Sequence, residues 1–261
     1  MPEQRKSFHQ ELDEIRDQIV ELGALVREFI PRGTEVLLTG DMGGALALID
    51  ADDEIDALTL RVEEQCYNVL ARQQPMASDM RSIVTAVWLT GELERSGDLM
   101  VNVAKAARRI YGATLDPRLR GLIERMSEEA SRLISLSLDA YVERDASLGA
   151  ALADIDDALD TIHGDYIEAI FDAHSADDLG LQPAVQLALV GRYYERIGDH
   201  AVNIGQRVQY MVTGWLPEQT GAARLRARAA FGDAADGDPS AEAPSDHEPI
   251  EDHDRPGEGP R

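Results

Sequence analysis

The chain has 261 residues, of which 44% are hydrophobic and only 5% aromatic, and its formal net charge is −24. The hydrophobic content is enough for a buried core, and the scarcity of aromatic residues favours helices over a β-sandwich. The acidic excess argues against non-specific nucleic-acid binding, which depends on neutralising phosphates, and against contact with anionic lipid. Cations are the natural counter-charge of such a chain.

The cysteine content and the lengths of the apolar runs indicate the cellular compartment in which the protein is expected. Cys66 is the only cysteine, so an intrachain disulfide is impossible and a reducing environment is expected. The first residues, up to Glu14, are charged before any long apolar run, so no signal peptide is expected. No stretch of about 18 apolar residues occurs that would span a membrane. We therefore expect a soluble, cytoplasmic protein.

The first part of the chain is predicted to form three helices. Apolar residues recur in steps of three and four from Phe8 to Phe29, which indicates a helix. Pro31 either kinks or ends this helix, and a weaker helical stretch follows to Gly40. The remaining two helices are separated by Pro75 and are predicted over 52–72 and 79–111.

The second part repeats this organisation from Pro117 onward, with helices predicted over 119–142, 146–173 and 181–212. No run of residues alternates with period two, so no strands are expected. The sequence thus predicts an all-α fold of two pseudo-symmetric three-helix bundles, over 1–113 and 114–216. Residues 217–261 mix acidic residues with Pro, Gly and Ser after an Arg-rich start, which predicts a disordered acidic tail whose simplest role is solubility.

One charged 11-residue sequence occurs twice, 101 residues apart. Residues 94–104 read Glu-Arg-Ser-Gly-Asp-Leu-Met-Val-Asn-Val-Ala, and residues 195–205 read Glu-Arg-Ile-Gly-Asp-His-Ala-Val-Asn-Ile-Gly. The retained pairs are Glu94/Glu195, Arg95/Arg196, Gly97/Gly198, Asp98/Asp199, Val101/Val202 and Asn102/Asn203. A repeat at this distance indicates a duplicated unit of domain size. Because acidic and amide groups are retained at helical spacing, the duplicated feature is interpreted as a site as well as a scaffold.

In the first copy these polar groups share one helix face. Glu94, Asp98 and Asn102 follow one another in steps of four, whereas Leu89 and Leu93 lie on the opposite side and are expected to face the core. The carboxylate side then lines a groove or rim.

The preceding helix is expected to bring two more carboxylates, Asp52 and Asp56, to the same level. Asp56 lies 19 residues before Pro75 and Glu94 lies 19 residues after it. Helices joined by a short turn run antiparallel with equal rise per residue, so these two side chains should meet at the same height.

The second unit has Asp156 and Asp160 in the matching place, although their register is open. A strict 101-residue offset pairs Asp53 with Asp154 and Asp56 with Asp157. A three-residue deletion instead pairs Asp52 and Asp56 with Asp156 and Asp160. The second register is preferred because it preserves an Asp-x-x-x-Asp-x-Leu/Ile pattern.

Several carboxylates at one level must spread apart, take up protons, pair with arginine or bind cations. Oxygen-only clusters suit hard divalent or ferric ions, namely Mg, Ca, Mn or Fe. A solvated acidic face is the simpler alternative, but duplication of the set favours metal binding. His163 and His200 are weaker candidates because the first unit has no histidine at the matching positions. The candidate ligands are Asp52, Asp56, Glu94, Asp98, Asn102, Asp156, Asp160, Glu195, Asp199 and Asn203.

These motifs resemble those of the PhoU family, the phosphate-specific transport system accessory proteins. The resemblance covers about residues 7–214. It is carried by Gln-Pro-Met-Ala-Ser-Asp-Met-Arg at 74–81, by the two Glu-Arg-x-Gly-Asp-x-x-x-Asn motifs and by the paired Asp-x-x-x-Asp segments. The sequence at 208–214 is similar to that of actinobacterial members.

The resemblance implies two pseudo-symmetric three-helix bundles, a homodimer, and metal clusters on a concave surface with Glu94, Asp98, Glu195 and Asp199 as ligands. It also implies a cytoplasmic negative regulator of phosphate-starvation genes. Such a regulator relays the state of the phosphate ABC transporter ATPase to a membrane sensor histidine kinase and its response regulator. Two features depart from the family pattern: the second unit has Leu-Gln-Pro at 181–183 where the first has Asp-Met-Arg at 79–81, and the acidic tail lies outside the pattern.

Three functional hypotheses follow. A metal-loaded signalling adaptor without enzymatic activity is preferred, because two acidic sites occur without a nucleophile or substrate-pocket motif. A metal-independent helical scaffold ranks second. A carboxylate-bridged metal enzyme, such as a phosphohydrolase or an oxidase, ranks third.

Overall fold

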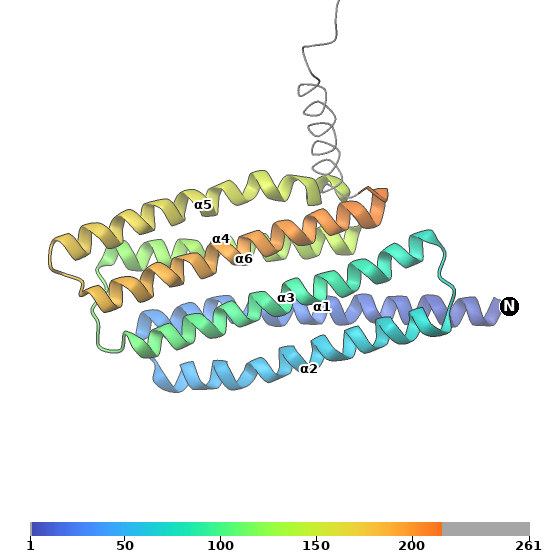
Figure 1. Cartoon of the computed structure of the whole chain (residues 1–261), viewed down its shortest axis with the longest axis horizontal. Coiled ribbons are helices and arrows are strands. Elements are labelled where there is room, and N and C mark those ends of the chain that lie inside the picture. Colours follow the sequence, from blue (N-terminus) through green and yellow to red (C-terminus); the bar gives the residue numbers. More distant parts are fainter. Residues whose placement is uncertain (1, 216–261) are drawn as a thin grey trace, which may run out of the picture. The chain divides into compact units, whose positions relative to one another are not determined.

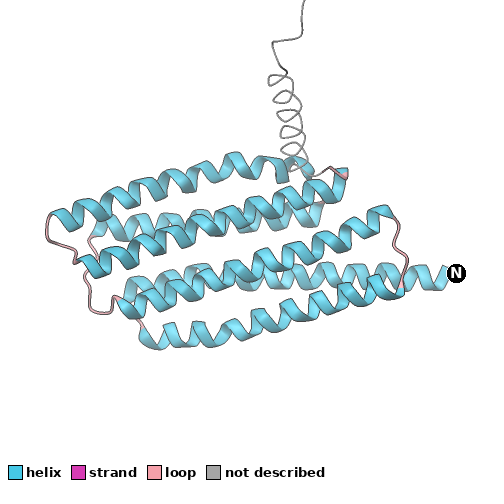
Figure 2. Cartoon of the chain, viewed as in Figure 1, coloured by secondary structure: helices cyan, strands magenta, loops and turns pink. Residues whose placement is uncertain are grey.

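Six α-helices make up residues 2–215, the part of the chain that this computed structural model describes (Figures 1 and 2). The all-α prediction is confirmed, since no strand occurs between residues 2 and 215. The expected disorder of 217–261 lies outside the described residues. Within them, no helix combines the length and the apolar character needed to cross a bilayer. The helices are α1 (Pro2–Thr39), α2 (Met42–Arg72), α3 (Ala77–Arg109), α4 (Pro117–Glu143), α5 (Ala146–Ser175) and α6 (Leu181–Thr213).

Two helices of the first half run further than the sequence pattern suggested. Helix α1 passes through Pro31 without ending, and Phe29 and Ile30 beside the proline are buried in the core. Their burial outweighs the cost of a proline inside a helix, about 3 kcal/mol. Helix α2 begins ten residues earlier than predicted, because the side chain of Asp41 caps it by accepting a hydrogen bond from the backbone N–H of Gly43.

The six helices, between Pro2 and Thr213, pack in two layers (Figure 1). Contacts between α2 and α3, α3 and α6, and α6 and α5 define a layer of four helices in that order. Helices α1 and α4 contact each other and pack behind it, α1 against α2 and α3, and α4 against α5 and α6. The two three-helix bundles therefore meet along α3–α6 and α1–α4, and the other side of the four-helix layer is left open.

The core fills the space between the layers. Leu89 and Leu93 of α3 are fully buried, as predicted, and Cys66 of α2 is a buried free thiol. Three hydroxyl groups form a hydrogen-bonded group inside this apolar core. The Thr34 hydroxyl lies 2.7 Å from the Tyr194 hydroxyl and donates to Ser127 Oγ at 2.7 Å. This group joins α1, α4 and α6, so it links the two bundles as well as filling the core.

Candidate metal site

The first carboxylate cluster lies where α2 and α3 run side by side on the open face. Asp52 and Glu94 are half-buried, whereas Asp56 and Asp98 are exposed. Burial, together with the charges of Asp56, Asp98 and Glu94, raises the pKa of Asp52 to about 6. Burial and the charges of Asp98 and Asp56 likewise raise the pKa of Glu94. The expectation that Asp56 and Glu94 meet at the same height is thus confirmed, because the four carboxylates are close enough to shift one another's pKa values.

The second cluster lies between α5 and α6 and is more deeply buried. Asp156 is only 9% exposed, and its Oδ1 atom has no hydrogen-bond partner among the described residues. Burial and the charges of Asp160, Asp199 and Asp157 raise its pKa to about 6. Glu129 of α4 also contributes, and the sequence motifs did not point to it. A buried ionised carboxylate that accepts no hydrogen bond destabilises the fold, so a bound proton or cation at this oxygen would stabilise it.

The retained glycines of the repeated motif explain how the aspartates come so close. A Cβ atom at Gly198 would overlap Oδ1 of Asp156. At Gly97 a Cβ atom would lie 3.6 Å from Oδ1 of Asp52 and 3.0 Å from the Ile55 side chain. Glycine in α3 and α6 therefore lets an aspartate of the neighbouring helix pack against the backbone.

The same contacts settle the equivalence of the two units. Gly97 faces Asp52 and Ile55, whereas Gly198 faces Asp156 and Leu159. Asp52 thus corresponds to Asp156, which is the register with the three-residue deletion and not the strict 101-residue offset. Under the strict offset the counterpart of Asp156 would be Ile55, which is a buried apolar residue.

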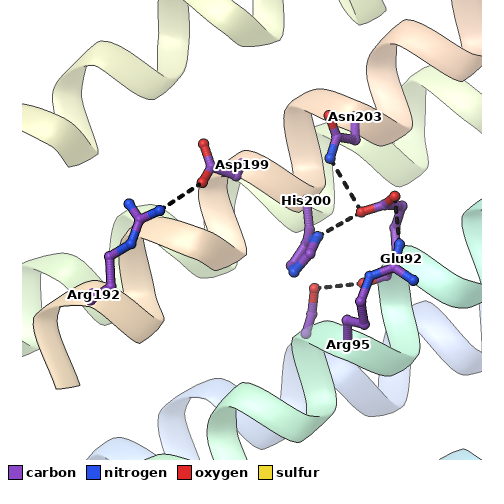
Figure 3. Close-up of polar contacts among 7 residues, drawn as sticks. Glu92, Arg95, Arg192, Asp199, His200 and Asn203 are labelled. Atoms are coloured by element: carbon purple, nitrogen blue, oxygen red, sulfur yellow. Dashed lines mark hydrogen bonds and ion pairs between the residues drawn. The ribbon is translucent and has the colours of Figure 1, made fainter. Parts of the chain in front are cut away.

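Arginine makes the two clusters unequal. Arg192 of α6 forms an ion pair with Glu195. Its guanidinium also lies 3.9 Å from the carboxylate of Asp199 (Figure 3). The matching position in α3 is Gly91, so Glu94 has no equivalent partner at that place. Glu195 is therefore held by an arginine, while Glu94 shares its surroundings with other carboxylates. His163, beside the second cluster, has its pKa lowered by burial and by the charge of Arg192.

A buried polar group that the motifs did not predict joins α3 to α6 (Figure 3). Oε2 of Glu92 accepts from Nδ1 of His200 at 2.6 Å and from Nδ2 of Asn203 at 3.3 Å, and Oε1 lies 2.6 Å from Arg95. Burial would raise the pKa of Glu92, but the His200 hydrogen bond, Arg95 and Asn203 bring it below its ordinary value. The amide of Asn203 thus points to Glu92, whereas its counterpart Asn102 is half-buried on α3, one turn beyond Asp98.

The donor set fits a hard cation, although the side chains are not closed around one. Among the described residues, no three His, Cys, Asp or Glu groups converge on one point as a ready-made metal site. The oxygen donors, the raised pKa values and the orphaned Oδ1 of Asp156 nevertheless suit a divalent or ferric ion. Asp56, Asp98, Asp160 and Asp199 are exposed, so they are free to turn toward an ion held by Asp52 or Asp156.

Comparison with known proteins identifies relatives over most of the chain. The phosphate-specific transport system accessory protein PhoU homolog 1 of Mycobacterium tuberculosis is 35% identical over 216 residues, which cover 82% of this chain and 97% of that protein. PhoU homolog 2 of the same organism is 31% identical over 82% of this chain and 100% of that protein.

Solved structures agree in fold. The crystal structure of PhoU from Pseudomonas aeruginosa superposes with a TM-score of 0.74 at 29% identity, over 80% of this chain and 100% of that chain. The phosphate transport system regulatory protein PhoU from Streptococcus pneumoniae gives a TM-score of 0.73 at 26% identity, over 80% and 98% of the two chains. The PhoU domain family model matches residues 19–107 and 123–208, one match in each half of the six-helix fold. The chain therefore belongs to the PhoU family.

Proposed function

We propose that this chain is an accessory regulator of phosphate transport that represses phosphate uptake and phosphate-starvation genes when phosphate is plentiful. It acts in the cytoplasm as an adaptor between a phosphate ABC transporter and a sensor histidine kinase, as a homodimer and without catalytic turnover. Family membership and the names of its relatives, phosphate-specific transport system accessory proteins, support this assignment.

Metal ions are part of the proposal. The observation that carries it is the pair of matched carboxylate clusters, in which a motif glycine lets Asp52 or Asp156 pack against the neighbouring helix. The first cluster would use Asp52, Asp56, Glu94 and Asp98, and the second Asp156, Asp160 and Asp199. Glu195 would join the second after release from Arg192. Asn102 would supply an amide oxygen to the first cluster, and Asn203 would supply one to the second after turning away from Glu92. Bound Fe, Mn, Mg or Ca would remove the repulsion among these carboxylates.

The chemistry favours a structural or signalling metal over a catalytic one. A cation would lower the cost of the buried charge of Asp156 and tie α5 to α6, and the first cluster would tie α2 to α3 in the same way. Each metal therefore stiffens one side of the open face that a partner protein would contact.

The test is complementation of a strain that lacks this protein, with a reporter for a phosphate-starvation gene. Wild-type protein should repress the reporter in phosphate-rich medium, and Asp98→Ala with Asp199→Ala should lose both metal and repression. Asp53→Ala with Asp154→Ala is the matched control, because these exposed aspartates lie on α2 and α5 in the rejected register. Repression by the Asp98→Ala, Asp199→Ala protein would contradict the metal-dependent mechanism.

A further inference from the structure

Two apolar stripes are exposed on the open face of the four-helix layer and are duplicates of each other. On α3 the stripe consists of Met80, Val84 and Trp88, and on α6 of Leu181, Val185 and Leu189. Each residue of the second stripe lies 101 residues after its counterpart, the offset of the repeated motif. Apart from the half-buried Val84, these side chains are 40–66% exposed. Their spacing of four residues places each stripe on one face of its helix.

The stripes lie at opposite ends of the α3–α6 pair because the two helices are antiparallel. Arg81 of α3 donates to the carbonyl of Met211, and Glu92 contacts His200. In both pairs the residue numbers add up to 292, which defines the residues of α3 and α6 that lie at the same level. Residues related by the repeat differ by 101, and both conditions are met near Arg95 and Arg196. An approximate two-fold axis therefore passes beside these two residues. At a rise of 1.5 Å per residue, the centres of the two stripes are then ~35 Å apart along the helices.

Each stripe is bordered by an arginine of the opposite helix. The Arg207 guanidinium of α6 lies 4.0 Å from the centre of the Trp88 ring. At the other end, Arg109 of α3 donates to the side chain of Gln186 at 3.3 Å, next to Val185. The chemistry at both ends is therefore the same, an apolar patch with a cationic border, and it fits an apolar surface bordered by carboxylates.

From this arrangement we propose that the two stripes together form one docking surface for a two-fold-symmetric partner protein, each of whose two subunits offers an apolar ridge bordered by acidic residues. A partner with two identical subunits meets two equivalent patches with the same surface, and simultaneous contact strengthens binding. A second copy of this chain is a poor occupant, because the arginines that border its stripes would meet the arginines that border the stripes of the first copy.

The inference deepens the proposed function, on which it rests: the paired ATPase subunits of a phosphate ABC transporter are partners of this symmetry. The probe is the intact phosphate transporter of the same organism, purified in detergent, and the full-length chain is titrated against it. Mass photometry should show one chain, or one protomer of a homodimer, facing each ATPase pair.

Substitutions in the two stripes should have equal effects. Trp88→Glu and Leu189→Glu, at positions 47% and 41% exposed, should each weaken binding by roughly 10-fold or more, and the double variant should not bind detectably. Leu60→Glu on α2, where the leucine is 57% exposed outside both stripes, is the control and should bind like wild type. If either variant unfolds at a lower temperature, Met80→Glu and Leu181→Glu replace the pair.

Four results would overturn the proposal. Unchanged binding by the double variant would show that docking occurs elsewhere. If substitution in only one of the two stripes weakened binding, a partner of two-fold symmetry would be excluded. Tighter binding by Arg109→Glu would show that the partner's border is basic. If wild type does not bind the transporter at all, this inference fails, while repression in the complementation assay decides the proposed function separately.

Discussion

Replacing Asp156 by asparagine should stabilise the metal-free protein near neutral pH. Its pKa rises from 3.8 to about 6 because the carboxylate is buried beside Asp160 and Asp199. A carboxyl group whose pKa is raised on folding contributes its full stability below the unfolded pKa and loses it as pH rises through the folded pKa. At ~1.4 kcal/mol per unit the shift is worth ~3 kcal/mol, which we reduce to about 1–2 kcal/mol because neighbouring exposed groups admit solvent.

The assay is urea unfolding in the presence of a chelator, followed by circular dichroism. At about pH 7.5 the Asp156→Asn protein should unfold with a free energy about 1–2 kcal/mol above that of wild type, and the difference should shrink toward about pH 4. Asp154→Asn is the matched control, since Asp154 is an exposed aspartate of the same helix, and it should change stability by less than about 0.5 kcal/mol. An Asp156→Asn protein no more stable than wild type, or a gain in stability that does not depend on pH, would show that the buried charge of Asp156 does not destabilise the fold.

Four further substitutions, of which Gly164→Ala is a control, test the packing around the site and between the two bundles. Gly198→Ala should destabilise the fold by about 1–3 kcal/mol because the methyl group overlaps Asp156, whereas Gly164→Ala on open α5 surface should stabilise it by up to about 1 kcal/mol; chemical unfolding measures both, and equal effects would contradict the close approach. Tyr194→Phe should cost about 1 kcal/mol in thermal unfolding, since it removes the hydroxyl beside Thr34. Glu92→Ala should cost roughly 2–4 kcal/mol because it strips His200, Arg95 and Asn203 of their acceptor; a neutral result would show that this group does not hold α3 to α6.

Local sequence patterns predicted the parts of the site that lie within one hairpin. Asp56 and Glu94 are equally distant from Pro75, so equal helical rise was enough to bring their levels together. The motif glycine could be recognised as retained, but its reason became visible only when Asp52 and Asp156 were placed against it.

Features that depend on contact between the two bundles could not be predicted in this way. Glu92 meets His200 across the α3–α6 contact, and neither residue is duplicated: Tyr193 and Leu99 stand at the matching positions. Arg192 stands in the second half where the first half has Gly91, and its ion pair with Glu195 has no counterpart at Glu94. Repetition in the sequence therefore indicated what the halves share, whereas the interface between them uses residues that differ.

The extent of the helices was predicted less well than their number, for local physical reasons. Pro31 and the pair Gly43–Gly44 are residues that usually end helices. Burial of Phe29 and Ile30 carries α1 past its proline, and the Asp41 cap starts α2 just before the glycines. Tertiary packing and a single N-cap thus outweighed the low helix propensity of proline and glycine.

The most direct test of the central claim is the metal content of the full-length protein purified without chelator, measured by elemental analysis beside the Asp98→Ala, Asp199→Ala double variant. The wild type should contain stoichiometric iron, manganese, magnesium or calcium, and the variant should lose this metal while its helical content, measured by circular dichroism, stays the same. Negligible metal in both proteins, or equal metal in both, would contradict the assignment of the duplicated carboxylates as ligands.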